Sequence, residues 1–159
     1  MKKLLSYISL AYFIVSALSS CEDNYTICNQ SKEVNCKGIF FKKTGGADVE
    51  TPVSSLTIKP LTATTFLYFQ QPGISAFTFA LNPVLDSAKY IFKIDNSISQ
   101  DTISLFYTSQ LLLISAECGN IITHQLSNAK TTKNLLDSVR IINPKVDNVS
   151  TTNLKVFFH

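Results

Sequence analysis

Apolar side chains alternate with polar ones along most of the chain after residue 30. A repeat of two residues is typical of β-strands with one buried face, whereas an amphipathic helix would repeat every three or four residues. Only the stretch from Lys130 to Leu136 fits a turn or two of helix. The alternation predicts strands at residues 34–42, 56–59, 77–81, 90–94, 103–107, 138–141 and 154–158.

Turn-forming residues separate these segments at intervals typical of antiparallel hairpins. They include Gly45-Gly46, Gln71-Pro72-Gly73, Asp95-Asn96 and Asn143-Pro144. Roughly eight to ten short strands, each with one buried face, favour an all-β fold. We predict an antiparallel β-sandwich of immunoglobulin-like type, with a small closed β-barrel as the alternative.

Two segments carry large apolar residues at consecutive positions, so that both faces of the strand are apolar. They are Ala63–Phe69 and Ile39–Phe41. Such strands are either central strands covered on both sides or part of a hydrophobic surface patch that binds a partner. We expect burial for both segments.

The first twenty residues follow a different pattern, with a basic start and then no charge. Lys2 and Lys3 precede a mostly apolar stretch, which is the layout of a secretory signal peptide. Five serines interrupt this stretch, and it is shorter than the roughly 20 apolar residues that a membrane span needs. The expected organisation is a cleaved signal peptide, a tether and one β-sandwich domain, at residues 1–20, 21–31 and 32–159.

The signal peptide ends in Leu18-Ser19-Ser20-Cys21, which resembles a bacterial lipobox. The resemblance implies that Cys21 carries diacylglycerol through a thioether and becomes the first residue of the mature protein. Each buried CH₂ contributes about 0.8 kcal/mol, so two or three acyl chains such as palmitate anchor a protein without a spanning helix. Glu22 and Asp23 resemble the surface-export signal of Bacteroidota lipoproteins. We expect an outer-membrane protein facing the periplasm or the cell surface.

Three cysteines remain once Cys21 is lipidated, in a compartment where disulfides persist. A bond between Cys28 and Cys118 would close a loop of about 90 residues and stabilise the fold by several kcal/mol. We predict this pairing, with Cys36 as a buried free thiol. A bond between Cys36 and Cys118 is the alternative.

Strand alternation within residues 110–118 places Cys118 on the same face as Leu112, Ile114 and Ala116. We therefore expect this face, with Cys118, to point into the core.

Charge and composition narrow the function classes. The chain is 45% hydrophobic and 16% charged, which excludes a disordered polyelectrolyte and an ordinary coiled coil. Lys2 and Lys3 belong to the signal peptide, so 12 basic residues against 11 acidic residues leave the mature chain at +1. Nucleic-acid binding needs a clustered basic excess, so we expect no nucleic-acid partner.

Motifs for catalysis and metal binding are missing. The chain has no G-x-S-x-G nucleophile motif, and Ser115, His124 and Asp137 belong to no recognisable triad pattern. It has no C-x-x-C spacing either, and His124 is an isolated histidine. Asp101 lies beside a predicted turn, where a solvated carboxylate is expected. We predict a non-enzymatic protein without a metal or cofactor.

One short pattern occurs three times, as Asp86-Ser87-Ala88, Asp101-Thr102-Ile103 and Asp137-Ser138-Val139. It resembles the O-glycosylation sequon of exported Bacteroidota proteins. The resemblance implies a glycan on at least one of Ser87, Thr102 and Ser138. The alternative is that Asp in a turn, followed by Ser or Thr and an apolar residue, simply begins a strand.

Several segments together resemble a family of Bacteroidota lipoproteins of uncharacterised function. They are the lipobox, Tyr25–Cys28, Leu81–Pro83, Ser115–Gly119, Asp137–Val139 and Asn153–Phe158. The most specific is Glu117-Cys118-Gly119, whereas Cys36 looks like an addition. The resemblance implies an envelope location and a small β domain, and it assigns no activity.

Our leading hypothesis is a lipid-anchored interaction or structural module that associates with an outer-membrane protein through a strand edge or an apolar patch. The alternative is a glycan- or small-ligand-binding accessory lipoprotein of an uptake system, which needs a concave site with exposed aromatic rings and polar groups.

Overall fold

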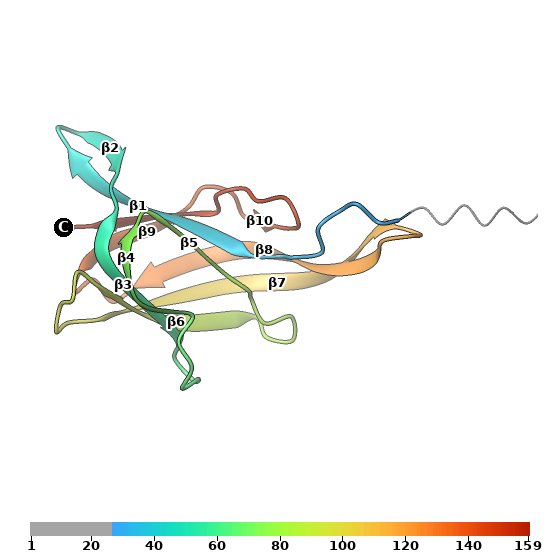
Figure 1. Ribbon diagram of the computed structural model, residues 1–159, viewed down its shortest axis with the longest axis horizontal. Helices are drawn as coiled ribbons and strands as arrows, with labels where there is room; N and C mark the ends of the chain where they lie inside the picture. Colours follow the sequence, from blue (N-terminus) through green and yellow to red (C-terminus); the bar gives the residue numbers. More distant parts are fainter. Residues whose placement is uncertain (1–26) are drawn as a thin grey trace, which may run out of the picture.

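Two β-sheets pack against each other over residues 27–159, the part of the chain that the computed structural model describes (Figure 1). The predicted antiparallel β-sandwich is confirmed, and the described residues form neither a helix nor a closed barrel. The strands are β1 (Cys36–Thr44), β2 (Ala47–Glu50), β3 (Val53–Pro60), β4 (Tyr68–Ile74), β5 (Ala76–Phe79), β6 (Ser87–Ile94), β7 (Asp101–Ser115), β8 (Gly119–Thr131), β9 (Leu136–Ile141), β10 (Lys145–Val146) and β11 (Leu154–Phe158).

One sheet has the order β2-β1-β11-β9, with β5 also paired to β1, and the other has the order β10-β8-β7-β6-β3-β4. Strands β1 and β11 run parallel, and the other paired neighbours run antiparallel. No helix within residues 27–159 is long and apolar enough to cross a membrane. The predicted signal peptide and Cys21 lie outside the described residues.

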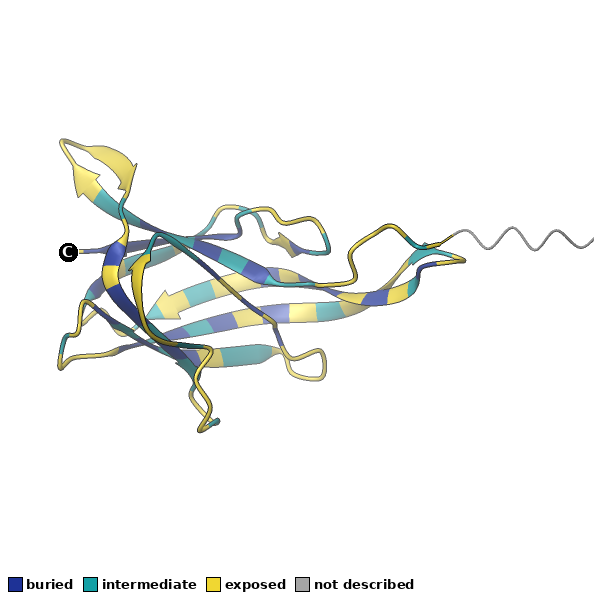
Figure 2. Cartoon of the chain, in the orientation of Figure 1, coloured by how far each residue is buried: buried dark blue, intermediate teal, exposed yellow. Residues whose placement is uncertain are grey.

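The core lies between the two sheets and takes every second residue of most strands, as the alternation predicted (Figure 2). In β6, Tyr90, Phe92 and Ile94 are buried, and in the neighbouring strand β7 the buried residues Ile103 and Leu105 lie on the same face of the sheet. Gly38 of β1 lies directly under the Phe77 ring, and a side chain at this position would overlap the ring. Glycine is therefore needed here for the close approach of β1 to β5.

In the apolar segment Ile39–Phe41, Phe40 is fully buried in the core, and Ile39 and Phe41, on the other face of β1, are half-buried. The rings of Phe41 and Phe157 lie 5.9 Å apart on this face. The Lys155 ammonium lies 4.6 Å from the centre of the Phe41 ring, and the Arg140 guanidinium lies 4.9 Å from that of Phe157. Basic side chains thus cover these rings, and the Lys155 ammonium also pairs with the Asp48 carboxylate at 3.2 Å.

The helical turn predicted at Lys130–Leu136 is wrong. Strand β8 continues to Thr131, and β9 begins at Leu136. Asp101, expected to be solvated, is fully buried and accepts hydrogen bonds from the Thr132 hydroxyl and from the backbone N–H groups of residues 134, 135 and 136. Because this carboxylate binds successive amides of the turn, those amides are not available to helical hydrogen bonds.

The prediction that Leu112, Ile114 and Ala116 face the core is also wrong. Leu112 is 38% exposed, Ala116 is exposed and Ile114 is only half-buried. The main reason is that these residues lie on the opposite face of β7 from Ile103, Leu105 and Tyr107, whose side chains enter the core. In addition, β6 pairs with β7 only up to Phe106, so the rest of β7 extends past the neighbouring strand. Cys118 is buried, but it lies at the end of this extension and outside the core cluster.

The cysteine prediction is confirmed. Cys28 and Cys118 form a disulfide across 90 residues of sequence, and Cys36 is a buried free thiol. Burial raises the pKa of the Cys36 thiol to about 12. The bond fixes the start of the described chain to the turn between β7 and β8.

Candidate binding cleft

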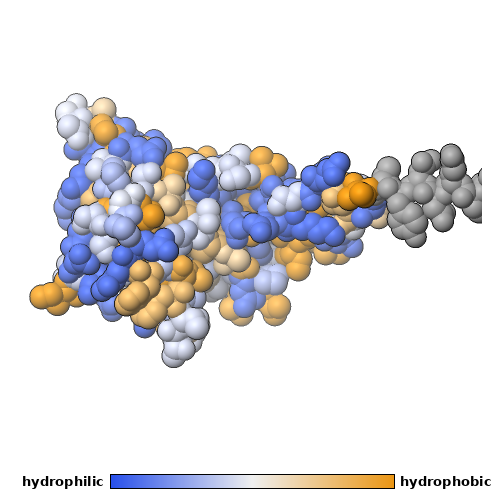
Figure 3. All heavy atoms as spheres, in the orientation of Figure 1, coloured by the Kyte–Doolittle hydropathy of each residue, from blue (hydrophilic) through white to orange (hydrophobic). Residues whose placement is uncertain are grey.

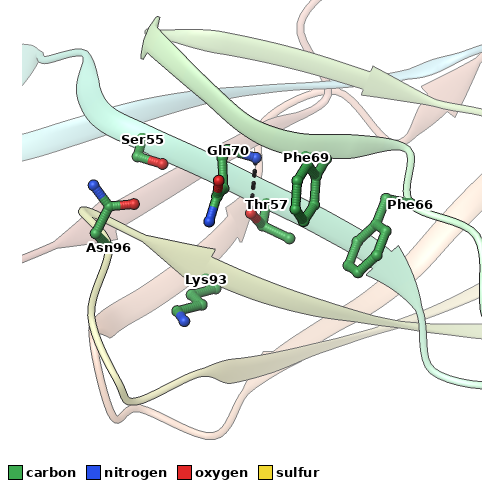
Figure 4. Close-up of a pocket in the computed structure, with 7 residues that line it drawn as sticks. All are labelled: Ser55, Thr57, Phe66, Phe69, Gln70, Lys93 and Asn96. Atoms are coloured by element: carbon green, nitrogen blue, oxygen red, sulfur yellow. Dashed lines mark hydrogen bonds between the residues drawn. The ribbon is translucent and has the colours of Figure 1, made fainter.

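A small cleft of about 170 Å³ opens on the outer side of the six-stranded sheet, where β4, β3 and β6 lie side by side (Figure 4). Leu56 and Ile58 of β3 point inward to the core, so the alternate residues Ser55 and Thr57 face the cleft. The lining residues are Ser55, Thr57, Phe66, Phe69, Gln70, Lys93 and Asn96.

An irregularity in strand pairing shapes the floor of the cleft. The register between β3 and β4 shifts between Leu56 and Ile58, as at a β-bulge. Gln70 has a left-handed backbone with φ of 47°, and its N–H donates to the Thr57 hydroxyl at 3.0 Å. A left-handed non-glycine residue is uncommon and often marks a functional position.

Two exposed aromatic rings form one wall. The ring centres of Phe66 and Phe69 lie 4.9 Å apart, and these residues are 47% and 60% exposed. Residues 63–69 were expected to be buried, and this prediction is wrong because β4 is the edge strand of its sheet and the segment before it is a loop. The alternative, a hydrophobic surface patch, describes these residues correctly.

The opposite wall is polar and is held by a tight turn. Asp95 and Asn96 both have φ of 54°, and the Asp95 carboxylate accepts hydrogen bonds from the Ser54 N–H at 2.6 Å and the Ser54 hydroxyl at 2.9 Å. Figure 4 shows Asn96 on the side of the cleft away from the two rings, Gln70 between Asn96 and Phe69, and Lys93 beside Gln70 on β6. No carboxylate is among the lining residues. The cleft therefore offers ring faces, amides, hydroxyls and an ammonium group, a set suited to binding rather than to acid–base chemistry.

A larger groove of about 530 Å³ lies between the end of β3 and the loop after β5. Its lining is mainly apolar, with Lys89 as the charged side chain. Two tyrosine hydroxyls stabilise the loop, because Tyr90 donates to the Ala80 carbonyl and Tyr107 to the Asn82 carbonyl, at 2.9 and 3.0 Å. Burial raises the pKa of both tyrosines, so they remain donors. Thr62, Asn82 and Ser87 add polar side chains to the lining, but the groove has no pair of exposed aromatic rings like that of Phe66 and Phe69.

One family model, described as "Family of unknown function (DUF6452)", matches residues 55–158. The chain belongs to the DUF6452 family. This confirms the predicted membership of an uncharacterised family. No curated protein and no solved structure matches the chain.

The DUF6452 region contains all seven residues that line the cleft, together with the whole β7–β8 hairpin. It includes Cys118 but neither Cys28 nor Cys36. Sequence reasoning did not single out Phe66, Phe69 or Gln70 as site residues. The signal for Phe66 and Phe69 was the apolar run at residues 63–69, in which apolar and polar positions do not alternate.

The three predicted glycosylation positions lie at the beginnings of strands. Ser87 is the first residue of β6, Thr102 the second of β7 and Ser138 the third of β9, and all three are half-buried. This placement agrees with the alternative explanation, in which the pattern begins a strand. Glycosylation at these positions stays a prediction.

The structure does not bring Ser115, His124 and Asp137 together through any hydrogen bond. Ser115 accepts from the Cys118 N–H, and the Asp137 carboxylate pairs with His159 at 3.0 Å. His124 is buried beside Ser109, with 2.9 Å between Nδ1 and the hydroxyl oxygen, and burial lowers its pKa. Within residues 27–159, no three His, Cys, Asp or Glu side chains cluster as metal ligands.

Proposed function

We propose that this DUF6452 protein is a non-enzymatic lipoprotein of the Bacteroidota outer membrane, anchored through Cys21 and exposed on the cell surface. The observation that carries the proposal is the Cys28–Cys118 disulfide, which agrees with an oxidising compartment and fixes the domain close to the proposed anchor. The lipobox at residues 18–21 and the acidic pair Glu22-Asp23 support the anchor and the surface location.

The domain acts as an interaction module, and its contact surface is the apolar patch formed by Phe66, Leu67 and Phe69. These residues are 45 to 60% exposed and lie at or beside β4, the edge strand of the six-stranded sheet. An exposed aromatic patch is a common contact surface for a protein partner. An outer-membrane β-barrel protein, held in the same membrane, is the partner that this location favours.

The anchor is tested by replacing Cys21. We expect Cys21→Ala to release the protein from the membrane fraction and to abolish labelling by radioactive palmitate. Ser20→Ala is the matched control, because it keeps a small residue before Cys21 and preserves the lipobox. Membrane retention and palmitate labelling of the Cys21→Ala variant would contradict the proposal.

The partner surface is tested by crosslinking the native lipoprotein in membranes, followed by purification and mass spectrometry. We expect a specific crosslinked protein that the Phe66→Ala/Phe69→Ala double variant loses. Val84→Ala is the control, since Val84 is 89% exposed and does not line the cleft. An identical set of crosslinked proteins from the double variant would exclude this patch as the contact surface.

Glycan binding is the second candidate function, and the combination of ring faces with Gln70, Asn96 and Lys93 favours it. A sugar ring has an apolar face that packs on an aromatic ring and hydroxyls that pair with amide and ammonium groups. We expect binding to an oligosaccharide array that Phe69→Ala weakens at least about tenfold, a loss of about 1.4 kcal/mol. Phe106→Ala, at a half-exposed phenylalanine outside the cleft, should bind normally.

A further inference from the structure

The end of the β7–β8 hairpin extends past both sheets (Figure 1). Strand β6 pairs with β7 up to Phe106, and β10 pairs with β8 only at residues 124 and 125. From Thr108 to Thr123, the two strands of the hairpin pair only with each other within the described chain. We call residues 108–123 the distal hairpin. An isolated two-stranded hairpin is marginally stable in water, so this extension needs further support.

One face of the distal hairpin continues the apolar row of the core. Ile103, Leu105 and Tyr107 lie at every second position of β7 and are at most 2% exposed. The same row continues with Leu111 and Leu113, which are 68% and 63% exposed. Ile122, directly opposite Leu111 on β8, is 39% exposed. The apolar row that is buried in the core part of β7 therefore becomes exposed to solvent in the distal hairpin.

The hairpin is also almost free of charge. Between Thr102 and Ala129 the sequence has one acidic residue, Glu117 in the turn, and no Lys or Arg. His124 in this range is buried. A long extension that carries exposed leucines and so little charge is unusual for a surface that meets only water. Figure 3 shows hydrophobic residues at this end of the molecule, next to the grey trace.

The distal hairpin lies close to the proposed lipid anchor. The Cys28–Cys118 disulfide joins the turn to a residue that is seven positions after Cys21. Seven residues of fully extended chain reach at most about 25 Å. The Cα atoms of Cys28 and Cys118 lie 4.9 Å apart. Whatever path residues 22–27 take, the turn therefore stays within about 30 Å of the lipidated residue, less than the roughly 40 to 45 Å of a whole bilayer.

We propose that the distal hairpin rests on the membrane that holds the anchor, with Leu111, Leu113 and Ile122 in contact with lipid. This inference rests on the proposed lipidation of Cys21. The depth is limited to the headgroup region, because no other strand of residues 27–159 pairs with the hairpin edges, and hydrocarbon does not tolerate unpaired backbone N–H and C=O groups. Glu117 in the turn sets the same limit. The contact fixes the orientation of the domain, which a lipid tether alone would leave free.

The chain has no tryptophan, so a single introduced tryptophan reports on one position. The test uses full-length lipidated protein with Leu113→Trp or Leu111→Trp, in phosphatidylethanolamine–phosphatidylglycerol vesicles that contain brominated acyl chains. Ile98→Trp is the matched control, because Ile98 is fully exposed and precedes the other end of β7. We expect brominated lipid to quench the tryptophan fluorescence at positions 111 and 113 but not at position 98. Acrylamide should quench the fluorescence at positions 111 and 113 at least about threefold less than in the control.

Each other outcome overturns the proposal for a different reason. Vesicle flotation with equal acrylamide quenching at positions 98, 111 and 113 would leave the anchor intact and remove the hairpin contact. Failure of every variant to float would contradict lipidation itself. If the tryptophans at positions 111 and 113 were protected from acrylamide in the unlipidated mature chain in solution, the chain itself would cover these positions. Protection of these tryptophans from acrylamide in native membranes but not in lipid vesicles would show that a protein, and not lipid, covers the distal hairpin.

Discussion

The buried carboxylate of Asp101 holds the segment between β8 and β9 in place through hydrogen bonds. Burial alone would raise its pKa, but the hydrogen bonds from Asn134, Thr132, Leu135 and Leu136 outweigh burial and hold the pKa below its usual range. The sequence places these donors more than 30 residues from the acceptor, so the local pattern gave no sign of them. An Asp before Thr and Ile looks like an ordinary turn residue until the partner segment is known.

We expect Asp101→Asn to lower the free energy of unfolding at pH 7 by about 3 kcal/mol, because the amide nitrogen cannot accept from the buried N–H groups. The folded-state pKa of Asp101 is below its unfolded value of about 3.9, so the stabilisation is present above pH 4 and is lost as the pH falls through the folded-state pKa. Urea unfolding should therefore show a difference between the two proteins that shrinks in acid.

Asp86→Asn is the control for this experiment, because Asp86 is exposed and its carboxylate caps no turn. The Asp86→Asn variant should unfold like the wild type at pH 7 and in acid. Equal stability of the Asp101→Asn variant and the wild type at pH 7 would contradict the role assigned to this carboxylate.

The disulfide acts on the β7–β8 hairpin as an element, because it fixes the turn of a hairpin whose distal part pairs with no other strand in the part of the chain that the structure describes. We expect Cys28→Ser/Cys118→Ser to cost about 4 to 5 kcal/mol, from the chain entropy of a loop of this length. Hydrogen exchange should rise most across residues 108–123 and least in the core part of β7.

Cys36→Ala is the matched control, since it removes the free thiol and leaves the disulfide. It should cost about 1 kcal/mol, as expected for a small loss of buried volume, and leave exchange of the hairpin unchanged. Uniform exchange increases throughout the double variant would argue that the disulfide stabilises the whole domain rather than this element.

The strands that sequence reasoning predicted well are those with one covered face. Leu105 and Leu113 occupy equivalent positions of the same alternating row, yet the first is fully buried and the second is 63% exposed. Periodicity reports which residues share a face, and it does not report where the opposing sheet ends. The cleft was unpredictable for a related reason: its residues come together through the pairing of β4 with β3 and β6.

At the scale of the molecule, β7 connects two different ends. Its first residue, Asp101, follows the turn segment that carries Asn96 and Ile98, and its last residues belong to the distal hairpin. Fifteen residues of strand span about 50 Å, so the cleft side and the hairpin turn lie far apart. An anchor at Cys21, seven residues before the disulfide, therefore holds the cleft well away from the membrane.

This layout makes the cell-surface location testable with one thiol. Cys28 and Cys118 are bonded, and Cys36 is buried with a raised pKa, so none of them should react with a maleimide in the folded protein. Ile98→Cys adds an exposed thiol at the end away from the anchor. We expect a membrane-impermeant maleimide to label this variant on intact cells and to leave the wild type unlabelled. Glu22→Ala/Asp23→Ala, added to Ile98→Cys, should restrict labelling to permeabilised cells; the same restriction in Ile98→Cys alone would mean a periplasmic domain.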